Sequence, residues 1–241
     1  MNDRVTGIVI RETEVKESDA IITVYTADHG QLSLYARGLR KVTSRNAYAC
    51  QLFDCSEFLL DYNPGKDVQL LKSAVLKREY MGIRADYDRL ALASVVIEII
   101  SQLQDDSLYE LLETTLEKLD QDEEAFTAFS VFVVQILNIL GISPVVDECV
   151  LCGNTKGIET ISIADGGFIC HECNKSVHLR PMDVDFLKKF RIINKAGFEV
   201  YDRLASSGLN DYQLSALLVE FLCTHSGMRL RSWRAVEGAV K

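Results

Sequence analysis

The chain has 241 residues, of which 48% are hydrophobic and 25% charged, as is typical of a soluble globular protein. We predict no signal peptide, and no apolar run approaches the roughly 20 residues that a membrane span requires. The formal net charge of −9 arises mainly in residues 81–148, which carry 3 basic and 14 acidic side chains. Residues 1–80 (11 basic, 11 acidic) and 149–241 (12 basic, 10 acidic) are nearly balanced, so overall acidity does not exclude a DNA-binding face.

Residues 1–80 are predicted to form a small β-barrel. Turn signals separate short runs rich in strand-forming residues: 5–11, 20–26, 31–37, 56–61 and 68–76. Apolar and polar residues alternate from Ile22 to Thr26, as in a half-buried strand. Five short strands favour the OB-fold, a five-stranded Greek-key barrel, although an SH3-like barrel fits the same pattern.

A basic segment lies between the third and fourth predicted strands. It contains Arg37, Arg40, Lys41 and Arg45, and no acidic residue occurs from 29 to 53. A mobile loop of this kind on a barrel rim could follow a phosphate backbone, and a merely solvated loop is the alternative. Tyrosines 25, 35 and 48 could stack on bases, but tyrosines on strands more often pack against neighbouring side chains.

Residues 81–241 are predicted to be mainly helical. Apolar residues recur at helical spacing over 90–103 and 108–119, and 125–140 is apolar enough to be a buried central helix. Gly141 and Pro144 end that helix, and the acidic run 120–124 suits its N-terminus through the helix dipole.

Two CxxC motifs interrupt the helical region. Cys149 and Cys152 form the first motif, and Cys170 and Cys173 form the second after 17 intervening residues. This spacing is typical of a tetrahedral zinc ion held by four thiolates, and we place it in an inserted module at 145–178. A redox pair, which would normally begin a helix after a strand, and a disulfide are the alternatives.

The predicted zinc shell is closed. His171 and His178 lie close to the second motif, but four cysteines already complete the coordination, which leaves no open position for catalysis. The three remaining cysteines, 50, 55 and 223, are an odd number, which indicates a reducing cytoplasm.

Two further basic clusters follow the cysteines. A helix predicted at 183–195 carries Lys188 and Lys189, and another helix is predicted at 211–223. The tail places three arginines around the only tryptophan, Trp233: Arg229, Arg231 and Arg234. Such a pattern fits nucleic-acid contact, or a helical turn with the tryptophan packed inward and solvated arginines. We find no paired catalytic carboxylates, phosphate-binding glycine loop or catalytic triad, and predict that the protein is not an enzyme.

Several stretches in the same order resemble the bacterial DNA repair protein RecO family. They include Glu-Ser-Asp-Ala-Ile-Ile-Thr-Val-Tyr-Thr (17–26), Ala-Arg-Gly-Leu-Arg-Lys (36–41), Ile-Leu-Asn-Ile-Leu-Gly-Ile-Ser-Pro (136–144) and Gly-Met-Arg-Leu-Arg-Ser (227–232). The resemblance implies a multidomain α+β chain: an OB-fold domain at 1–80 and a helical domain at 81–241 with the zinc module inserted. It also places the family's basic loop on Arg37, Arg40, Lys41 and Arg45, and its structural zinc ligands on the four cysteines.

The same resemblance implies a recombination mediator without catalysis, located in the cytoplasm in association with the nucleoid. Such proteins bind single- and double-stranded DNA and anneal complementary strands. With RecR, and in some bacteria RecF, they help to load RecA onto strands coated by single-strand binding protein (SSB). Two other hypotheses stay open: a protein-interaction adaptor with little DNA binding of its own, and a zinc enzyme, which the closed four-cysteine shell disfavours.

Overall fold

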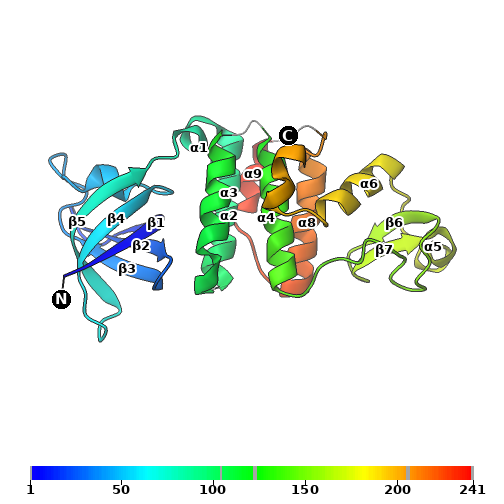
Figure 1. Cartoon of the computed structure of the whole chain (residues 1–241), viewed down its shortest axis with the longest axis horizontal. Coiled ribbons are helices and arrows are strands. Elements are labelled where there is room, and N and C mark those ends of the chain that lie inside the picture. Colours follow the sequence, from blue (N-terminus) through cyan, green and yellow to red (C-terminus); the bar gives the residue numbers. More distant parts are fainter. Residues whose placement is uncertain (1, 104, 122–123, 205–206, 240–241) are drawn as a thin grey trace. The chain divides into compact units, whose positions relative to one another are not determined.

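The computed structural model describes residues 2–103, 105–121, 124–204 and 207–239 (Figure 1). The chain divides into two compact units, Met1–Gln121 and Asp122–Lys241. None of the helices in these described ranges is long and apolar enough to span a membrane. The domain limits expected from the sequence, 1–80 and 81–241 with the module at 145–178, remain predictions.

The first unit begins with a closed five-stranded barrel, as the sequence predicted (Figure 1). Its strands follow the order β1-β2-β3-β5-β4: β1 (Asn2–Glu14), β2 (Ala20–Thr26), β3 (Gly30–Ala36), β5 (Val68–Arg78) and β4 (Cys55–Asp61). β1 passes from its pairing with β4 to its pairing with β2 at Gly7 and Ile8, which pair with both strands, and a register shift in the β1–β2 pairing follows between Val9 and Arg11. Gly7 lies at this crossing, where an added Cβ would be only 2.8 Å from the Tyr25 carbonyl oxygen.

The barrel closes through a short parallel contact between β3 and β5. Only three residue pairs form it, from Ser33–Val68 to Tyr35–Leu70. Side chains alternate along β3, so Leu34 and Ala36 are buried in the barrel core while Tyr35 faces outward. This alternation confirms the half-buried strands expected from the sequence.

Helices of the first unit pack on the barrel. They are α1 (Met81–Ala85), α2 (Tyr87–Leu103) and α3 (Tyr109–Gln121). Fully buried Tyr25 donates its hydroxyl to the carbonyl of Asp105, just before α3, and Gln31 Nε2 donates to the Ser101 carbonyl of α2 at 3.4 Å. Tyr25 is therefore a packing residue and has no free face for stacking on a base.

A buried ion pair fixes α1 to the barrel. The Asp54 side chain is 1% exposed and lies 2.6 Å from a guanidinium nitrogen of Arg84, which also donates to the Leu52 carbonyl at 2.9 Å. Burial raises the pKa of Asp54, although the hydrogen bond and charge of Arg84 oppose that rise. The guanidinium thus favours the charged form of a carboxylate that burial disfavours.

The second unit is built on α4 (Ala125–Ile139), which is buried along nearly its whole length, as predicted. It packs on α8 (Tyr212–Ser226), and the buried hydroxyls of Ser130 and Ser215 are 2.8 Å apart between these helices. Helix α6 (Val184–Ile193), helix α7 (Tyr201–Leu204) and helix α9 (Trp233–Ala239) complete this core. Gly141 has φ of 68° and follows the end of α4, where a left-handed residue commonly terminates a helix.

Trp233 belongs to the interior. Its side chain is 8% exposed and stacks on Phe129 of α4 at 5.7 Å and on Tyr212 of α8 at 6.0 Å between ring centroids. Of the two interpretations of the tail, the packed tryptophan is therefore the one observed, and this indole cannot stack on a base.

Replacing Arg84 with Ala should lower the free energy of unfolding by roughly 3 kcal/mol at neutral pH, because it leaves a buried carboxylate without its partner. The variant raises the folded-state pKa of Asp54 further above its unfolded value. The difference in stability between variant and wild type therefore grows as pH rises from the wild-type folded-state pKa of Asp54 to the higher folded-state pKa of the variant, and should be smaller at about pH 5 than at pH 7. Urea unfolding at both pH values measures this.

The control is the double variant D54N/R84A, in which no buried charge remains. It should recover much of the lost stability and show little pH dependence of the Arg84 effect. Equal losses at both pH values, or no recovery, would contradict the role given to this ion pair.

Candidate metal centre and nucleic-acid interface

The four predicted cysteine ligands converge in the second unit. A two-stranded hairpin, β6 (Ile158–Ser162) and β7 (Gly167–Cys170), and helix α5 (His171–Val177) carry the second CxxC motif. The first motif is tied to β7 by a hydrogen bond from Val150 N–H to the Phe168 carbonyl at 2.8 Å. All four Sγ atoms lie within 4.8 Å of one another.

This spacing suits a tetrahedral ion. With metal–sulfur bonds of roughly 2.3 Å, the sulfurs of a tetrahedron are about 3.8 Å apart. The Cys152 and Cys170 sulfurs are 3.7 Å apart. The chain therefore places four sulfur donors where one metal ion can bind them all.

The convergence of the two CxxC motifs, and not the secondary structure around the second motif, distinguishes a metal site from a redox pair here. Cys170 directly precedes α5 at the end of β7, which is the position expected for a redox dithiol, so that criterion does not discriminate here. The position of the first CxxC motif beside the second one does discriminate, because a redox dithiol needs only one CxxC motif. His171 is instead hydrogen-bonded through Nδ1 to Glu159 at 3.0 Å, and neither it nor His178 joins the cluster of described ligand atoms.

The thiols differ in acidity. Burial opposes ionisation of Cys149, but hydrogen bonds from the backbone N–H groups of Cys170, Leu151 and Cys152 outweigh it and lower its pKa to about 6. Hydrogen bonding to Cys152, together with burial, raises the pKa of Cys173 to about 12. A metal ion binds the thiolate form of cysteine, so a bound cation competes with protons at this cluster.

The basic segment forms an ordered loop between β3 and the short helix η1 (Ala47–Cys50). Gly38 has φ of 62°, and its N–H donates to the Asp19 carboxylate at 2.7 Å. Arg40 N–H donates to the Ser18 carbonyl at 3.1 Å. The β1–β2 loop therefore holds the basic loop in place.

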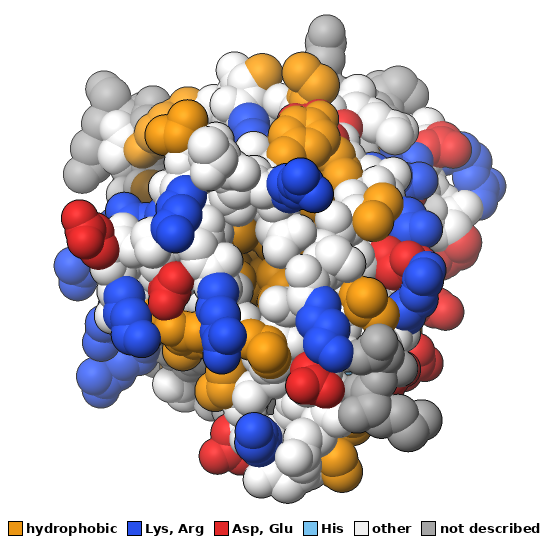
Figure 2. Space-filling model, turned by 90° about the vertical axis from the view of Figure 1, so that its left-hand side faces the viewer, with side chains coloured by type: hydrophobic (Ala, Val, Ile, Leu, Met, Phe, Trp, Pro, Cys, Tyr) orange, Lys and Arg blue, Asp and Glu red, His pale blue; other side chains and the backbone are white. Residues whose placement is uncertain are grey.

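The four cations of this loop are not equivalent. Arg37, Lys41 and Arg45 line one pocket of about 370 Å³ together with hydroxyl-bearing Thr43 and Ser44, and these three cations make no ion pair with any described residue. Arg40 instead lies 2.6 Å from the Glu14 carboxylate. Figure 2, which views the barrel end, shows many Lys and Arg side chains around a shallow hollow. The pocket offers positive charge and hydrogen-bond donors to an anion.

The basic residues of α6, and Lys195 two residues after it, are paired with carboxylates. Their ion pairs are Lys188–Asp185 at 2.9 Å, Lys189–Asp211 at 3.7 Å, Arg191–Asp147 at 2.6 Å and Lys195–Asp147 at 2.7 Å. The tail arginines are exposed: Arg229, Arg231 and Arg234. These two clusters belong to the second unit and the basic loop to the first, so the sequence-predicted contacts do not form one site within either unit.

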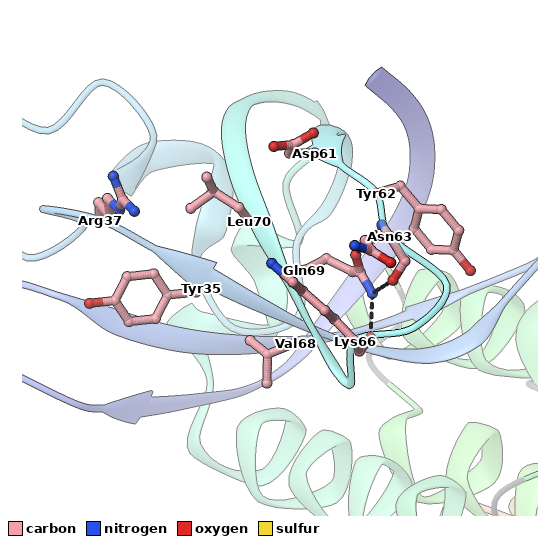
Figure 3. A pocket seen from close by; sticks show the side chains of 9 residues that line it. All are labelled: Tyr35, Arg37, Asp61, Tyr62, Asn63, Lys66, Val68, Gln69 and Leu70. Carbon is pink, nitrogen blue, oxygen red and sulfur yellow. Dashed lines mark hydrogen bonds between the residues drawn. The ribbon is translucent and has the colours of Figure 1, made fainter. Parts of the chain in front are cut away.

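A second pocket on the barrel lies beside the β4–β5 loop, and only its Arg37 was a predicted contact (Figure 3). The alternation along β3 could have indicated that Tyr35 accompanies Arg37 on the outer face. Nothing in the sequence indicated Lys66, because the parallel pairing of β3 with β5 brings it there.

Comparisons with known proteins match both halves of the chain. The family described as Recombination protein O N terminal matches residues 1–80, and the family described as Recombination protein O C terminal matches residues 84–234. Curated relatives include the DNA repair protein RecO of Listeria monocytogenes, which is 30% identical over 77% of this chain and 76% of the relative. Those of Halalkalibacterium halodurans (26% identical; 96% of this chain, 92% of the relative) and an Exiguobacterium species (27% identical; 100% and 98%) extend over nearly the whole length.

Replacing Cys170 with Ser should abolish metal binding and expose β6, β7 and α5 to solvent, since the binding free energy of a structural metal is folding free energy. Elemental analysis of the purified protein measures the metal. Hydrogen–deuterium exchange should accelerate in peptides from 145–178 and stay unchanged in the barrel.

The matched control is C223S, which alters a cysteine of the same unit outside the cluster. It should keep the metal and the wild-type exchange pattern. A metal-free C170S protein with wild-type protection of β6 and β7 would contradict a structural role.

Proposed function

This chain belongs to the Recombination protein O (RecO) family of DNA repair and recombination proteins, and we propose that it is a recombination mediator without catalytic activity of its own. It binds single- and double-stranded DNA and anneals complementary strands. The observation that carries the proposal is the loop pocket in which Arg37, Lys41 and Arg45 have no ion-pair partner among the described residues.

The mechanism follows from phosphate neutralisation. Each Lys or Arg that contacts a phosphate releases condensed counterions, which favours binding without regard to sequence. Arg37, Lys41 and Arg45 break no protein ion pair when they meet DNA, whereas Lys188 and Lys189 must first leave their carboxylates. Neutralising the phosphates of two strands lowers their mutual repulsion, which is the barrier to annealing that such a protein can reduce.

The basic loop is therefore our proposed main DNA contact. Arg40 stays a predicted contact, but it gains less free energy on meeting a phosphate because it is already paired with Glu14. The other predicted contacts, on α6 and in the tail, are secondary in this proposal: Lys188, Lys189, Arg229, Arg231 and Arg234. They could bind a second strand or another segment of the same strand.

We also propose that the four-cysteine cluster holds one structural Zn²⁺. Cys149, Cys152, Cys170 and Cys173 supply only sulfur, the donor set typical of structural zinc. The bound ion would join the first CxxC segment to the hairpin and leave no position for water or substrate. The residues around it fold the module and perform no chemical step.

The proposed partners are RecR and SSB, with RecF in some bacteria, and the outcome is loading of RecA on SSB-coated single strands in the cytoplasm, at the nucleoid. An adaptor function is the second candidate. Two observations favour this adaptor function. Residues 81–148 are acidic overall, with 14 acidic and 3 basic side chains, and ion pairs already engage the cations of α6.

Binding of the purified protein to a labelled single-stranded oligonucleotide at several salt concentrations tests the proposal. A mediator should show log affinity falling steeply with log salt, by about 0.7 for each phosphate contacted, and should speed annealing of the complement. Salt-insensitive binding to RecR or SSB, with no DNA binding at low salt, would favour the adaptor.

A triple variant, R37Q/K41Q/R45Q, should weaken binding to all sequences alike and reduce the magnitude of that salt slope by about 2, since three phosphate contacts are lost. The control K188Q/K189Q/R191Q removes the same number of cations from ion-paired positions and should change the slope much less. The reverse result would assign the main DNA contact to α6.

A further inference from the structure

The outer face of the barrel carries a row of partly exposed apolar side chains across three strands. In the strand register, Ile21 of β2 lies opposite Tyr35 of β3, and Tyr35 lies opposite Leu70 of β5. Their neighbours Ile22, Leu34 and Leu71 point into the barrel core. The row therefore places three partly exposed apolar side chains side by side, with an aromatic ring at their centre, on the face that points away from the barrel core.

A pocket of about 280 Å³ opens beside this row (Figure 3). It forms where the β3–β5 ladder ends at Tyr35–Leu70 and the β4–β5 loop, residues 62–67, approaches from the other side. Figure 3 shows Tyr35 and Arg37 on one side of it, and Tyr62 and Asn63 on the other.

Buried Gln69 builds the wall of this pocket. It is 3% exposed, and its side-chain oxygen accepts from Asn63 N–H at 2.7 Å. Its Nε2 donates to the carbonyls of Asn63 at 3.0 Å and Lys66 at 2.6 Å. The β4–β5 loop is thus held by a fully bonded amide, so that the pocket exists before any ligand arrives.

The ring of Tyr35 is also fixed, because its hydroxyl donates to Asp19 at 2.5 Å. Two cations of the lining, Arg37 and Lys66, make no ion pair with any described residue. Asp61 is the one acidic side chain among the described lining residues, and Lys72 lies 3.7 Å from it. The pocket therefore combines an immobile aromatic face with a net positive charge.

Arg37 lines both this pocket and the pocket of the basic loop, so the two are adjacent. We propose that the β3–β5 pocket binds one unpaired base of single-stranded DNA, which stacks on Tyr35 while Arg37 and Lys66 contact the flanking phosphates. This assignment rests on the proposed DNA binding. It adds a base-contacting site that a duplex, whose bases are already stacked, cannot use.

The experiment compares an oligo-dT with an oligonucleotide of equal length made of abasic sites, which has the same phosphates but no bases. Wild-type protein should bind oligo-dT roughly fivefold or more tightly, the range measured for loss of a stacked base. Tyr35→Leu keeps an apolar side chain but no ring and should abolish the preference, whereas Tyr35→Phe should retain it. Affinity for duplex should be equal in all three proteins.

A charge variant gives an independent measurement that does not disturb the strand. Lys66→Gln, in the exposed loop, should weaken binding of single strands and leave duplex affinity unchanged. Lys77→Gln, at the other end of β5, removes a cation that is paired with Glu57 at 3.4 Å, and should change the affinities for single strands and duplex equally little.

The outcomes separate this inference from the proposed function. If wild-type protein binds oligo-dT and the abasic strand equally, or Tyr35→Leu keeps the preference, the base site is wrong while DNA binding stands. If the wild-type protein binds neither strand at low salt, the proposed DNA binding fails and this inference fails with it.

Discussion

The Asp19 carboxylate holds together the face of the barrel on which the proposed function depends. One of its oxygens accepts the Gly38 N–H that starts the basic loop, and the other accepts the Tyr35 hydroxyl. These bonds, with that of Tyr35 the stronger influence, lower the pKa of Asp19, so it remains charged at physiological pH. Asp19 thus positions both the basic loop and the Tyr35 ring. Its negative charge is stabilised by two uncharged hydrogen-bond donors.

The pairing of charges matters more here than their number. The chain has 35 acidic and 26 basic residues, yet several cations of the barrel are free of carboxylates while those of α6 are not. A free cation gains its full interaction with a phosphate, but a paired one exchanges one anion for another. Counting charges along the sequence gave the loop and α6 similar prominence, and only the folded structure distinguishes them.

Local patterns predicted most of the fold. Alternation gave the strands, helical spacing gave α4 and α8, and the CxxC spacing gave the sulfur cluster. What the sequence could not supply was long-range pairing. Lys195 forms an ion pair with Asp147, 48 residues away in the sequence. Leu70 pairs with Tyr35 in a parallel ladder, which no local turn signal predicts. The sequence was compatible with Trp233 as a base-stacking residue or as a core residue. Its stacking on Phe129 and Tyr212, which are distant in sequence, places it in the core.

The closure of the barrel has a consequence for the order of folding during synthesis. Val5 in the first strand pairs with Phe58, and β3 pairs with β5, whose last residue is Arg78. The sheet of β1, β2 and β3 can form early, but its two outer edges, on β1 and β3, stay open until β4 and β5 have left the ribosome. Contacts between residues so far apart are slow to form, whereas the helices that follow need only local ones. The face that we propose to contact DNA, which requires β3, β5 and both loops, is therefore completed only after synthesis has passed into the helical region.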